Sequence, residues 1–243
     1  MQYNSCSMST IDTASASSNK ATAIATGNAL WNRVPKANAE LFALTYGALV
    51  TEVLRDYGDD IAAANEQLDK MGHSMGVRCV DEYLAKLSSA APPCSNFMET
   101  AEVLAKSALK MFLGITADVV YGNADDSAPS YSLMLTENPL AMFVEMPEAY
   151  LNNNSSSGSN SNSNSNASTS DNKSKSSAQK PKNAQLEYNA VYCGLIRGAL
   201  EMLNMRVECS FVKSTLRGDD VNEIQVQLQE VMSEGAGEEY QEE

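Results

Sequence analysis

The spacing of apolar side chains along the chain predicts four main helices and four strands. Apolar residues that recur every three to four positions indicate helices, and apolar residues that alternate with polar ones indicate strands. The predicted helices cover residues 40–57, 61–87, 96–113 and 185–204, and the predicted strands cover residues 117–121, 131–136, 205–211 and 224–228. This order favours an α+β domain, in which a four-stranded antiparallel meander carries the helices on one face.

The ends of the third predicted helix are marked by residues that favour helix termini. Asn96 is a good N-cap, Glu99 stands where it can complete a capping box, and Gly114 suits the left-handed conformation that ends helices. Pro92 and Pro93 prevent the preceding helix from continuing, because proline lacks an amide hydrogen and its ring clashes with the preceding turn. The sequence therefore predicts two helices joined by a short loop that contains both prolines.

A single thiol, Cys94, lies in this loop just ahead of the helix. Unpaired amide hydrogens and the positive end of the helix dipole favour a thiolate there, so we expect a chemically prepared cysteine. A Cys–His enzyme is one alternative, because the chain has one histidine, His73. No protease signature surrounds Cys94 and no orienting Asn or Asp follows His73, so we interpret His73 as a polar residue on a helix surface.

Two predicted helices contain glycines four positions apart, Gly72 with Gly76 and Gly194 with Gly198. A glycine inside a helix costs about 1 kcal/mol relative to alanine. Because the two glycines of a pair share one helix face, they favour either close approach of another backbone or room for a ligand. A simple bend in the helix is the third interpretation, and the sequence leaves all three open.

Composition divides the chain into one domain and three segments without a core. Residues 1–36 are rich in Ser, Thr, Ala and Asn without periodicity, so we expect a disordered N-terminal extension. Residues 151–183 are an Asn/Ser-rich insertion, and residues 233–243 form a tail with five glutamates and no cation. A single domain over residues 37–232 tolerates such an insertion in a surface loop, because loop-closure entropy grows slowly with length.

Charge and cysteine content exclude several classes of function. The formal net charge of -14 argues against a nucleic-acid-binding surface, which needs an excess of Lys and Arg. The five cysteines are odd in number and widely spaced, which fits neither a disulfide framework nor a zinc site. We expect no signal peptide and no membrane span, and a reducing cytosol is the simplest compartment. No phosphate-binding glycine loop is present, and we interpret the acidic residues Asp81, Glu82, Glu99 and Glu102 as parts of solvated helix faces.

Long segments of the chain resemble the Bet-three family of subunits of the transport protein particle, the TRAPP complex. The segments are LFALTYGALVTEVLRDY, LDKMGHSMGVRCVDEYLA, FMETAEVLAKSALKMFLGIT, ENPLAMFVEMPE and YCGLIRGALEMLNMRVECSFVKSTLRGDDVNEIQVQL. The resemblance covers nearly all of residues 38–150 and 184–232, in order and with matching gaps.

This resemblance implies a non-catalytic role in transport from the endoplasmic reticulum to the Golgi apparatus. A family member would be a core scaffold subunit of a vesicle-tethering complex, paired through its helices with sibling subunits, and would bind no nucleic acid. It would belong to the nucleotide-exchange core for a Rab-type GTPase, and the tail residues Glu238 and Glu239 would lie near that GTPase. The resemblance places such a subunit in the cytoplasm, peripherally associated with the cis Golgi and the endoplasmic reticulum membrane.

The resemblance also implies one covalent cofactor, a palmitate chain that is thioester-linked to Cys94 and held in a hydrophobic channel. No metal or nucleotide cofactor is implied. The helix that bears Ala108 would form part of the channel wall, where a bulkier side chain would block the bore. The residues expected to line the channel are Gly72, Gly76, Leu104, Ala108 and Met111.

The sequence departs from the family pattern at three places. His73 stands where relatives carry an aromatic residue, and Pro93 stands where a basic residue is usual. The last strand is followed by Gln, Glu and Met where a relative is basic. The alternative function is a stand-alone sensor domain that binds a small hydrophobic molecule, which a distantly related bacterial family suggests.

Overall fold

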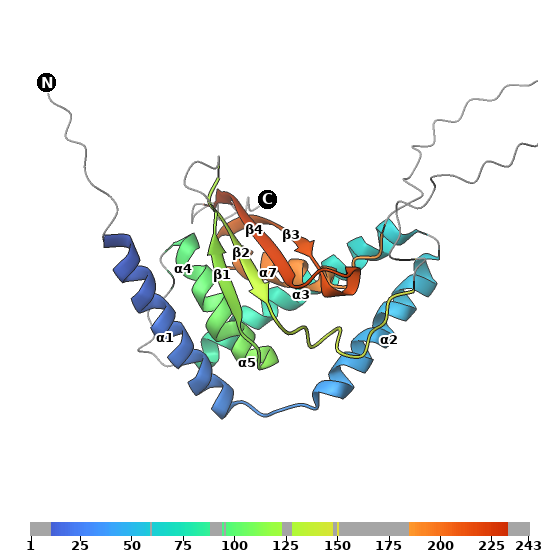
Figure 1. The fold of residues 1–243 in the computed structure, drawn as a ribbon, viewed down its shortest axis with the longest axis horizontal. Coiled ribbons are helices and arrows are strands. Elements are labelled where there is room, and N and C mark those ends of the chain that lie inside the picture. Colours follow the sequence, from blue (N-terminus) through green and yellow to red (C-terminus); the bar gives the residue numbers. More distant parts are fainter. Residues whose placement is uncertain are drawn as a thin grey trace, which may run out of the picture.

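A four-stranded antiparallel sheet carries helices on one face, as the sequence predicts (Figure 1). The computed structural model describes residues 11–58, 60–87, 94, 96–122, 128–147, 150 and 185–232. The helices are α1 (Ile11–Arg33), α2 (Ala39–Tyr57), α3 (Ile61–Lys86), α4 (Phe97–Glu102), the π-helix η1 (Val103–Ala108), α5 (Leu109–Leu113), α7 (Ala190–Glu201) and the 3-10 helix η2 (Thr215–Arg217). The strands are β1 (Ala117–Tyr121), β2 (Ser130–Leu135), β3 (Met205–Lys213) and β4 (Asn222–Val231).

The sheet is built from two hairpins rather than from a meander. Its strand order is β1-β2-β4-β3, so β4 lies next to β2 and the prediction of a meander is wrong. The chain leaves β2, passes through α7 and returns at the edge as β3, and the hairpin then brings β4 into the centre. Leu133 of β2 pairs with Ile224 of β4, and Val226 pairs with Cys209 of β3. Ile224 and Val226 are therefore almost fully buried.

The glycine pairs bring α3 and α7 into backbone contact. A Cβ atom at Gly72 would lie 2.2 Å from the carbonyl oxygen of Val191, and one at Gly198 would lie 2.2 Å from that of His73. Such distances are shorter than any van der Waals contact, so only glycine allows this approach. Of the three interpretations left open by the sequence, the close approach of a second backbone is confirmed.

The helix α7 begins at Ala190, five residues later than predicted. Tyr188 and Asn189 form a turn instead, and Asn189 is 3% exposed. Its side chain donates to the hydroxyl of Ser214 at 3.2 Å and accepts from the amide of Asn138 at 3.0 Å. These bonds tie the start of α7 to two loops that periodicity does not reveal.

The predicted helix 96–113 is a continuous rod made of α4, η1 and α5, which we call the wall rod. Its caps are confirmed, because the Asn96 side chain accepts from the amide of Glu99 at 2.9 Å and Gly114 has φ 75°. The π-helical segment in its middle was not predicted. Pro92 and Pro93 lie outside the described residues.

Part of the N-terminal extension is a helix, which corrects the expectation of disorder over residues 1–36. α1 is 23 residues long and packs on η1, α5 and α4. Ala23 and Leu30 are 4% and 3% exposed, so α1 contributes to a buried contact. Most of its apolar residues are alanines, which explains why periodicity does not detect it.

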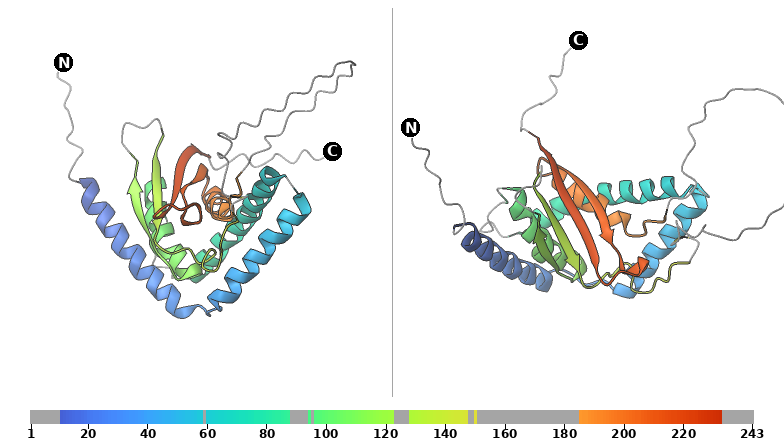
Figure 2. Two further views of the ribbon diagram at one scale, coloured as in Figure 1. Left: turned by 45° about the vertical axis from the view of Figure 1, so that its right-hand side comes forward. Right: turned by 45° about the horizontal axis from the view of Figure 1, so that its top comes forward.

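Figures 1 and 2 show α1 and α2 diverging from the connector 34–38, with the wall rod beside α1 and α3 beside α2. The core lies between the inner face of the sheet and α3, α7 and α4, and its largest fully buried side chains include Tyr131, Leu68 and Leu133. Within the described part of the chain, none of the helices combines the length and apolar character that a membrane span requires.

Candidate functional site

Cys94 lies at the entrance to the wall rod, half-buried and close to two tyrosines. It precedes the N-cap Asn96 by two positions. A Cys94 charge would act on the phenols of both Tyr83 in α3 and Tyr131 in β2, so the thiol lies where the wall rod, α3 and the sheet meet. Sequence reasoning placed Cys94 ahead of the helix but did not identify its tyrosine neighbours.

The environment of Cys94 disfavours a thiolate. Burial raises the pKa of the Cys94 thiol, and the nearby Glu99 carboxylate raises it further, while a backbone hydrogen bond lowers it in part. This is contrary to the expectation that the helix N-terminus favours a thiolate at Cys94. The helix N-terminus supplies hydrogen-bond donors, but desolvation and the acidic side chain outweigh them.

Two small residues of the wall rod are buried in the core of the domain. Ala101 and Ala105 are both 0% exposed and belong to the main core cluster with Phe97 and Tyr131. The ring centroids of Phe97 and Tyr131 are 4.8 Å apart. The surroundings of this face are therefore apolar and aromatic, the lining that a hydrocarbon chain requires.

The five residues expected to line a channel do not form one group. Leu104 is partly buried against the main core cluster, and Ala108 is partly buried at the end of η1. Met111 is 4% exposed but lies outside that cluster, on α5 where α1 packs. Gly72 and Gly76 face the backbone of α7, so their role is helix packing, contrary to the expectation that they line the channel. Glu238 and Glu239 lie outside the described residues.

His73 is placed far from Cys94, which argues against a catalytic Cys–His pair. Its Nε2 atom lies 2.5 Å from Oε2 of Glu201 in α7. Tyr83, the α3 residue near Cys94, follows His73 by ten positions, which is about 15 Å of helix. His73 therefore joins α3 to α7 and does not reach the thiol.

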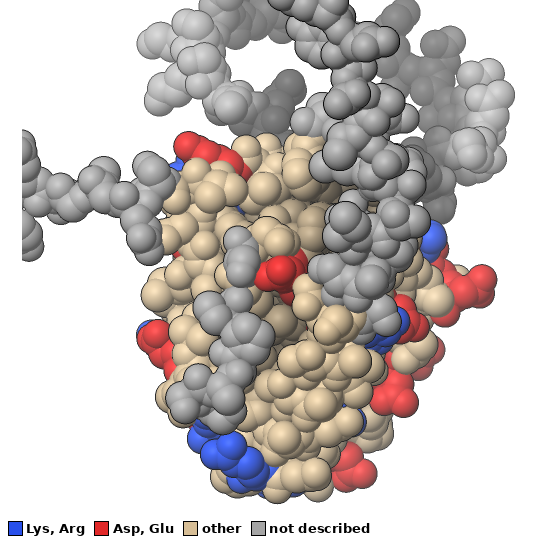
Figure 3. Space-filling view, turned by 90° about the vertical axis from the view of Figure 1, so that its left-hand side faces the viewer, with Lys and Arg blue, Asp and Glu red and all other residues tan. Residues whose placement is uncertain are grey.

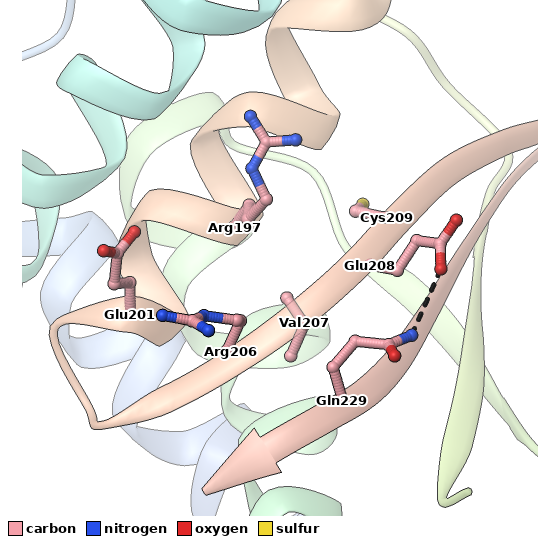
Figure 4. A pocket seen from close by; sticks show the side chains of 7 residues that line it. All are labelled: Arg197, Glu201, Arg206, Val207, Glu208, Cys209 and Gln229. Atoms are coloured by element: carbon pink, nitrogen blue, oxygen red, sulfur yellow. Dashed lines mark hydrogen bonds between the residues drawn. The ribbon is translucent and has the colours of Figure 1, made fainter. Parts of the chain in front are cut away.

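A separate pocket of about 510 Å³ lies beside the end of α7 and the edge strand β3 (Figure 4). It is lined by Arg197, Glu201, Arg206, Val207, Glu208, Cys209 and Gln229. Its charges are compensated, because Arg197 pairs with Asp69 and Arg206 lies 3.3 Å from Glu230. This charged lining is unsuited to an acyl chain, so the pocket is distinct from the Cys94 region.

Two buried charged side chains on the wall rod were missed by sequence reasoning. Glu102 is 6% exposed, contrary to the prediction of a solvated face, and accepts from the Tyr121 hydroxyl at 3.1 Å. Lys106 is 7% exposed, and its Nζ atom lies 2.7 Å from Oδ1 of Asp118 in β1. Glu102 and Lys106 are four positions apart, which is the spacing of an exposed ion pair on a helix. The sequence therefore does not reveal that both side chains are buried against β1.

Comparison with known proteins identifies the family. The family model described as transport protein particle (TRAPP) component matches residues 42–227. The trafficking protein particle complex subunit 3 of Dictyostelium discoideum is 41% identical over 208 residues, covering 86% of this chain and 92% of the relative. The subunit BET3 of Saccharomyces cerevisiae is 34% identical over 211 residues, covering 86% of this chain and 91% of the relative.

A solved structure gives the same result. The crystal structure of a trafficking protein particle complex subunit 3 from Naegleria fowleri, covalently bound to palmitic acid, has a TM-score of 0.62 and 45% sequence identity. It matches 81% of this chain and 98% of the solved chain. The sequence resemblance is thus confirmed, and the chain belongs to the TRAPP component family.

Proposed function

We propose that this chain is a core scaffold subunit of a TRAPP vesicle-tethering complex and carries a palmitoyl thioester on Cys94. Membership of the family implies assembly with sibling TRAPP subunits and is consistent with a non-catalytic role. The observation that supports the acyl group most directly is the palmitic acid held covalently by the solved relative. Cys94 is the thiol of this chain at the entrance to the wall rod, beside its small buried residues.

The chemistry around Cys94 fits a shielded thioester. The half-buried sulfur lies beside an apolar face formed by Phe97, Ala101 and Ala105. A thioester carries no charge, so a site that disfavours a thiolate by burial does not disfavour the acylated form. The acyl chain would run along this face between the wall rod and the sheet, with Leu104 and Ala108 farther along the rod.

The acyl proposal is tested by the intact mass of the protein purified from its own cells, before and after neutral hydroxylamine. We expect a fatty-acyl increment that hydroxylamine removes and that Cys94→Ser lacks. Cys79→Ser is the matched control, since Cys79 is also partly exposed but lies on α3. An increment that persists in Cys94→Ser, or none in the parent protein, would exclude a thioester at Cys94.

In the assembled complex we propose that the subunit supports nucleotide exchange on a Rab-type GTPase. Exchange needs no covalent chemistry, because it is sufficient that the complex binds the nucleotide-free GTPase better than the loaded one. The tail with Glu238 and Glu239 would lie near the GTPase, and the complex would associate peripherally with cis-Golgi and endoplasmic reticulum membranes. Equal exchange rates for purified assemblies with and without this subunit would contradict its part in exchange.

A stand-alone hydrophobe sensor is the second candidate, supported by the apolar face beside Cys94. The two candidates differ in what accompanies the protein when it is purified from its own cells at native abundance. The scaffold proposal requires sibling subunits in stoichiometric amount. Recovery as a homodimer with an exchangeable, non-covalent ligand would favour the sensor.

A further inference from the structure

The helix α1 lies outside the region that the family model matches, yet it covers the wall rod. The match begins at residue 42, whereas α1 ends at Arg33. α1 packs on η1, α5 and α4, on the opposite side of the molecule from α2 (Figure 2). Leu30 of α1 and Met111 of α5 are both buried outside the main core cluster, as a second and smaller apolar contact between these helices requires.

Gly27 marks the closest approach of α1 to the π-helical segment. A Cβ atom at this position would lie 2.3 Å from the carbonyl oxygen of Lys106 and 2.9 Å from Cα of Ser107. Both distances involve backbone atoms, which cannot rotate away as a side chain can. The two backbones are thus in direct contact, and any larger residue at position 27 must displace either α1 or η1.

The far end of α1 is fixed by an aromatic residue. A Cβ atom at Gly114, which ends the wall rod, would lie 2.8 Å from the ring of Trp31. The Nζ atom of Lys36 lies 4.0 Å from the centroid of this ring, and that of Lys110 lies 5.6 Å from it. Figure 3 shows Lys and Arg side chains at the lower end of the molecular face that bears α1. α1 thus holds the wall rod at two points, the π-helical segment and the C-terminal glycine.

The contact at Gly27 is connected to Cys94 through two side chains. Ser107, whose Cα atom faces Gly27, is 0% exposed and accepts a hydrogen bond from Tyr83 at 2.7 Å. Tyr83 in turn lies close enough to Cys94 for the two groups to interact electrostatically. A π-helical turn is an uncommon and weakly bonded conformation that often occurs at functional sites. Displacing η1 at Ser107 would therefore change the packing around the thiol.

We infer that α1 is a brace that holds η1 and Tyr83 in the position in which the Cys94 sulfur is shielded from water. The shielded group is the thioester of the proposed function where the protein is acylated, and the free thiol where it is not. Gly27 is in this sense a positioning residue, because it acts on Cys94 through Ser107 and Tyr83. The brace lies ahead of residues 42–227, the segment that the family model matches.

The test compares the full-length parent protein with Gly27→Val and with Ala29→Val, a matched control at an exposed position of α1. Two rates are measured, cleavage of the thioester by neutral hydroxylamine and alkylation of the deacylated Cys94 by iodoacetamide. We expect both rates in Gly27→Val to rise by about fivefold or more, as local opening of the shield requires, and Ala29→Val to behave as the parent.

The outcomes separate this inference from the proposed function. The presence or absence of a thioester in the parent tests the acyl attachment, whereas the alkylation rates test the brace in either case. Parent-like rates in a folded Gly27→Val protein would overturn the brace. If Gly27→Val does not fold, Leu30→Ala, which removes a buried α1 side chain without adding bulk, must raise both rates. Unchanged rates in Leu30→Ala would then overturn it.

Discussion

Glu99 and burial together keep the Cys94 thiol neutral, and their effects can be separated at the residue scale. Both raise the pKa of the thiol, so less thiolate exists at any given pH than for a free cysteine. Alkylation of deacylated Cys94 should therefore increase across the range from roughly pH 7 to pH 10 without reaching a plateau at the pH expected for a free thiol.

Replacing Glu99 by Gln removes the acidic contribution and leaves burial. We expect the pKa of Cys94 to fall and its alkylation near neutral pH to accelerate by about twofold, measured by peptide mass spectrometry. Glu137→Gln removes the same charge from an exposed loop and should leave the rate unchanged. A slower reaction in Glu99→Gln would contradict the electrostatic account.

The glycines of α3 and α2 differ in what a methyl group would meet. A Cβ atom at Gly72 would lie 2.2 Å from the Val191 carbonyl oxygen, whereas one at Gly47 would lie 3.5 Å from the Tyr188 hydroxyl. Gly72→Ala should lower the free energy of unfolding by about 3 kcal/mol through overpacking. Gly47→Ala should raise it by up to about 1 kcal/mol, because alanine favours the helix. Urea denaturation measures both, and equal effects would contradict the assignment.

At the scale of elements, local signals predicted where helices end better than they predicted which elements lie side by side. The caps at Asn96 and Gly114 depend on residues within one turn, so the sequence was sufficient for them. The position of β4 depends on how α7 crosses the sheet, which no periodicity encodes. α1 was missed because most of its apolar residues are alanines, and its stability comes from contact with the wall rod.

The central position of β4 has a direct consequence for stability. Ile224 is 1% exposed between β2 and β3, whereas Val231 at the end of the same strand is 63% exposed. Ile224→Ala should lower the free energy of unfolding by about 2–5 kcal/mol, because it leaves a cavity. Val231→Ala should change it by less than about 0.5 kcal/mol. If β4 lay at the edge of the sheet, as in a meander, the denaturation midpoints of the two variants would differ much less.

At the scale of the whole molecule, α2 carries apolar residues on both its buried and its exposed face. Its inner face buries Ala43, Tyr46, Val50 and Val53 against the rest of the domain. Its outer face exposes Leu41 and Leu44, which are 67% and 61% accessible and one helical turn apart. Exposed apolar residues that share a face are typical of protein interfaces. The sequence placed both leucines on this helix, but only the fold shows which face remains uncovered.

This outer face of α2 is where we expect a sibling TRAPP subunit to bind. Leu41→Glu with Leu44→Glu should weaken the pair by at least about 30-fold in dissociation constant, the effect of losing central apolar contacts and burying charge. Thr22→Glu adds a carboxylate at an exposed position of α1, away from this face, and should have little effect. Sedimentation equilibrium of the co-expressed pair measures affinity, and thermal unfolding of the isolated subunit shows whether the variants remain folded. An unchanged affinity in the folded double variant would exclude this face and direct the search to the exposed Met142 and Phe143.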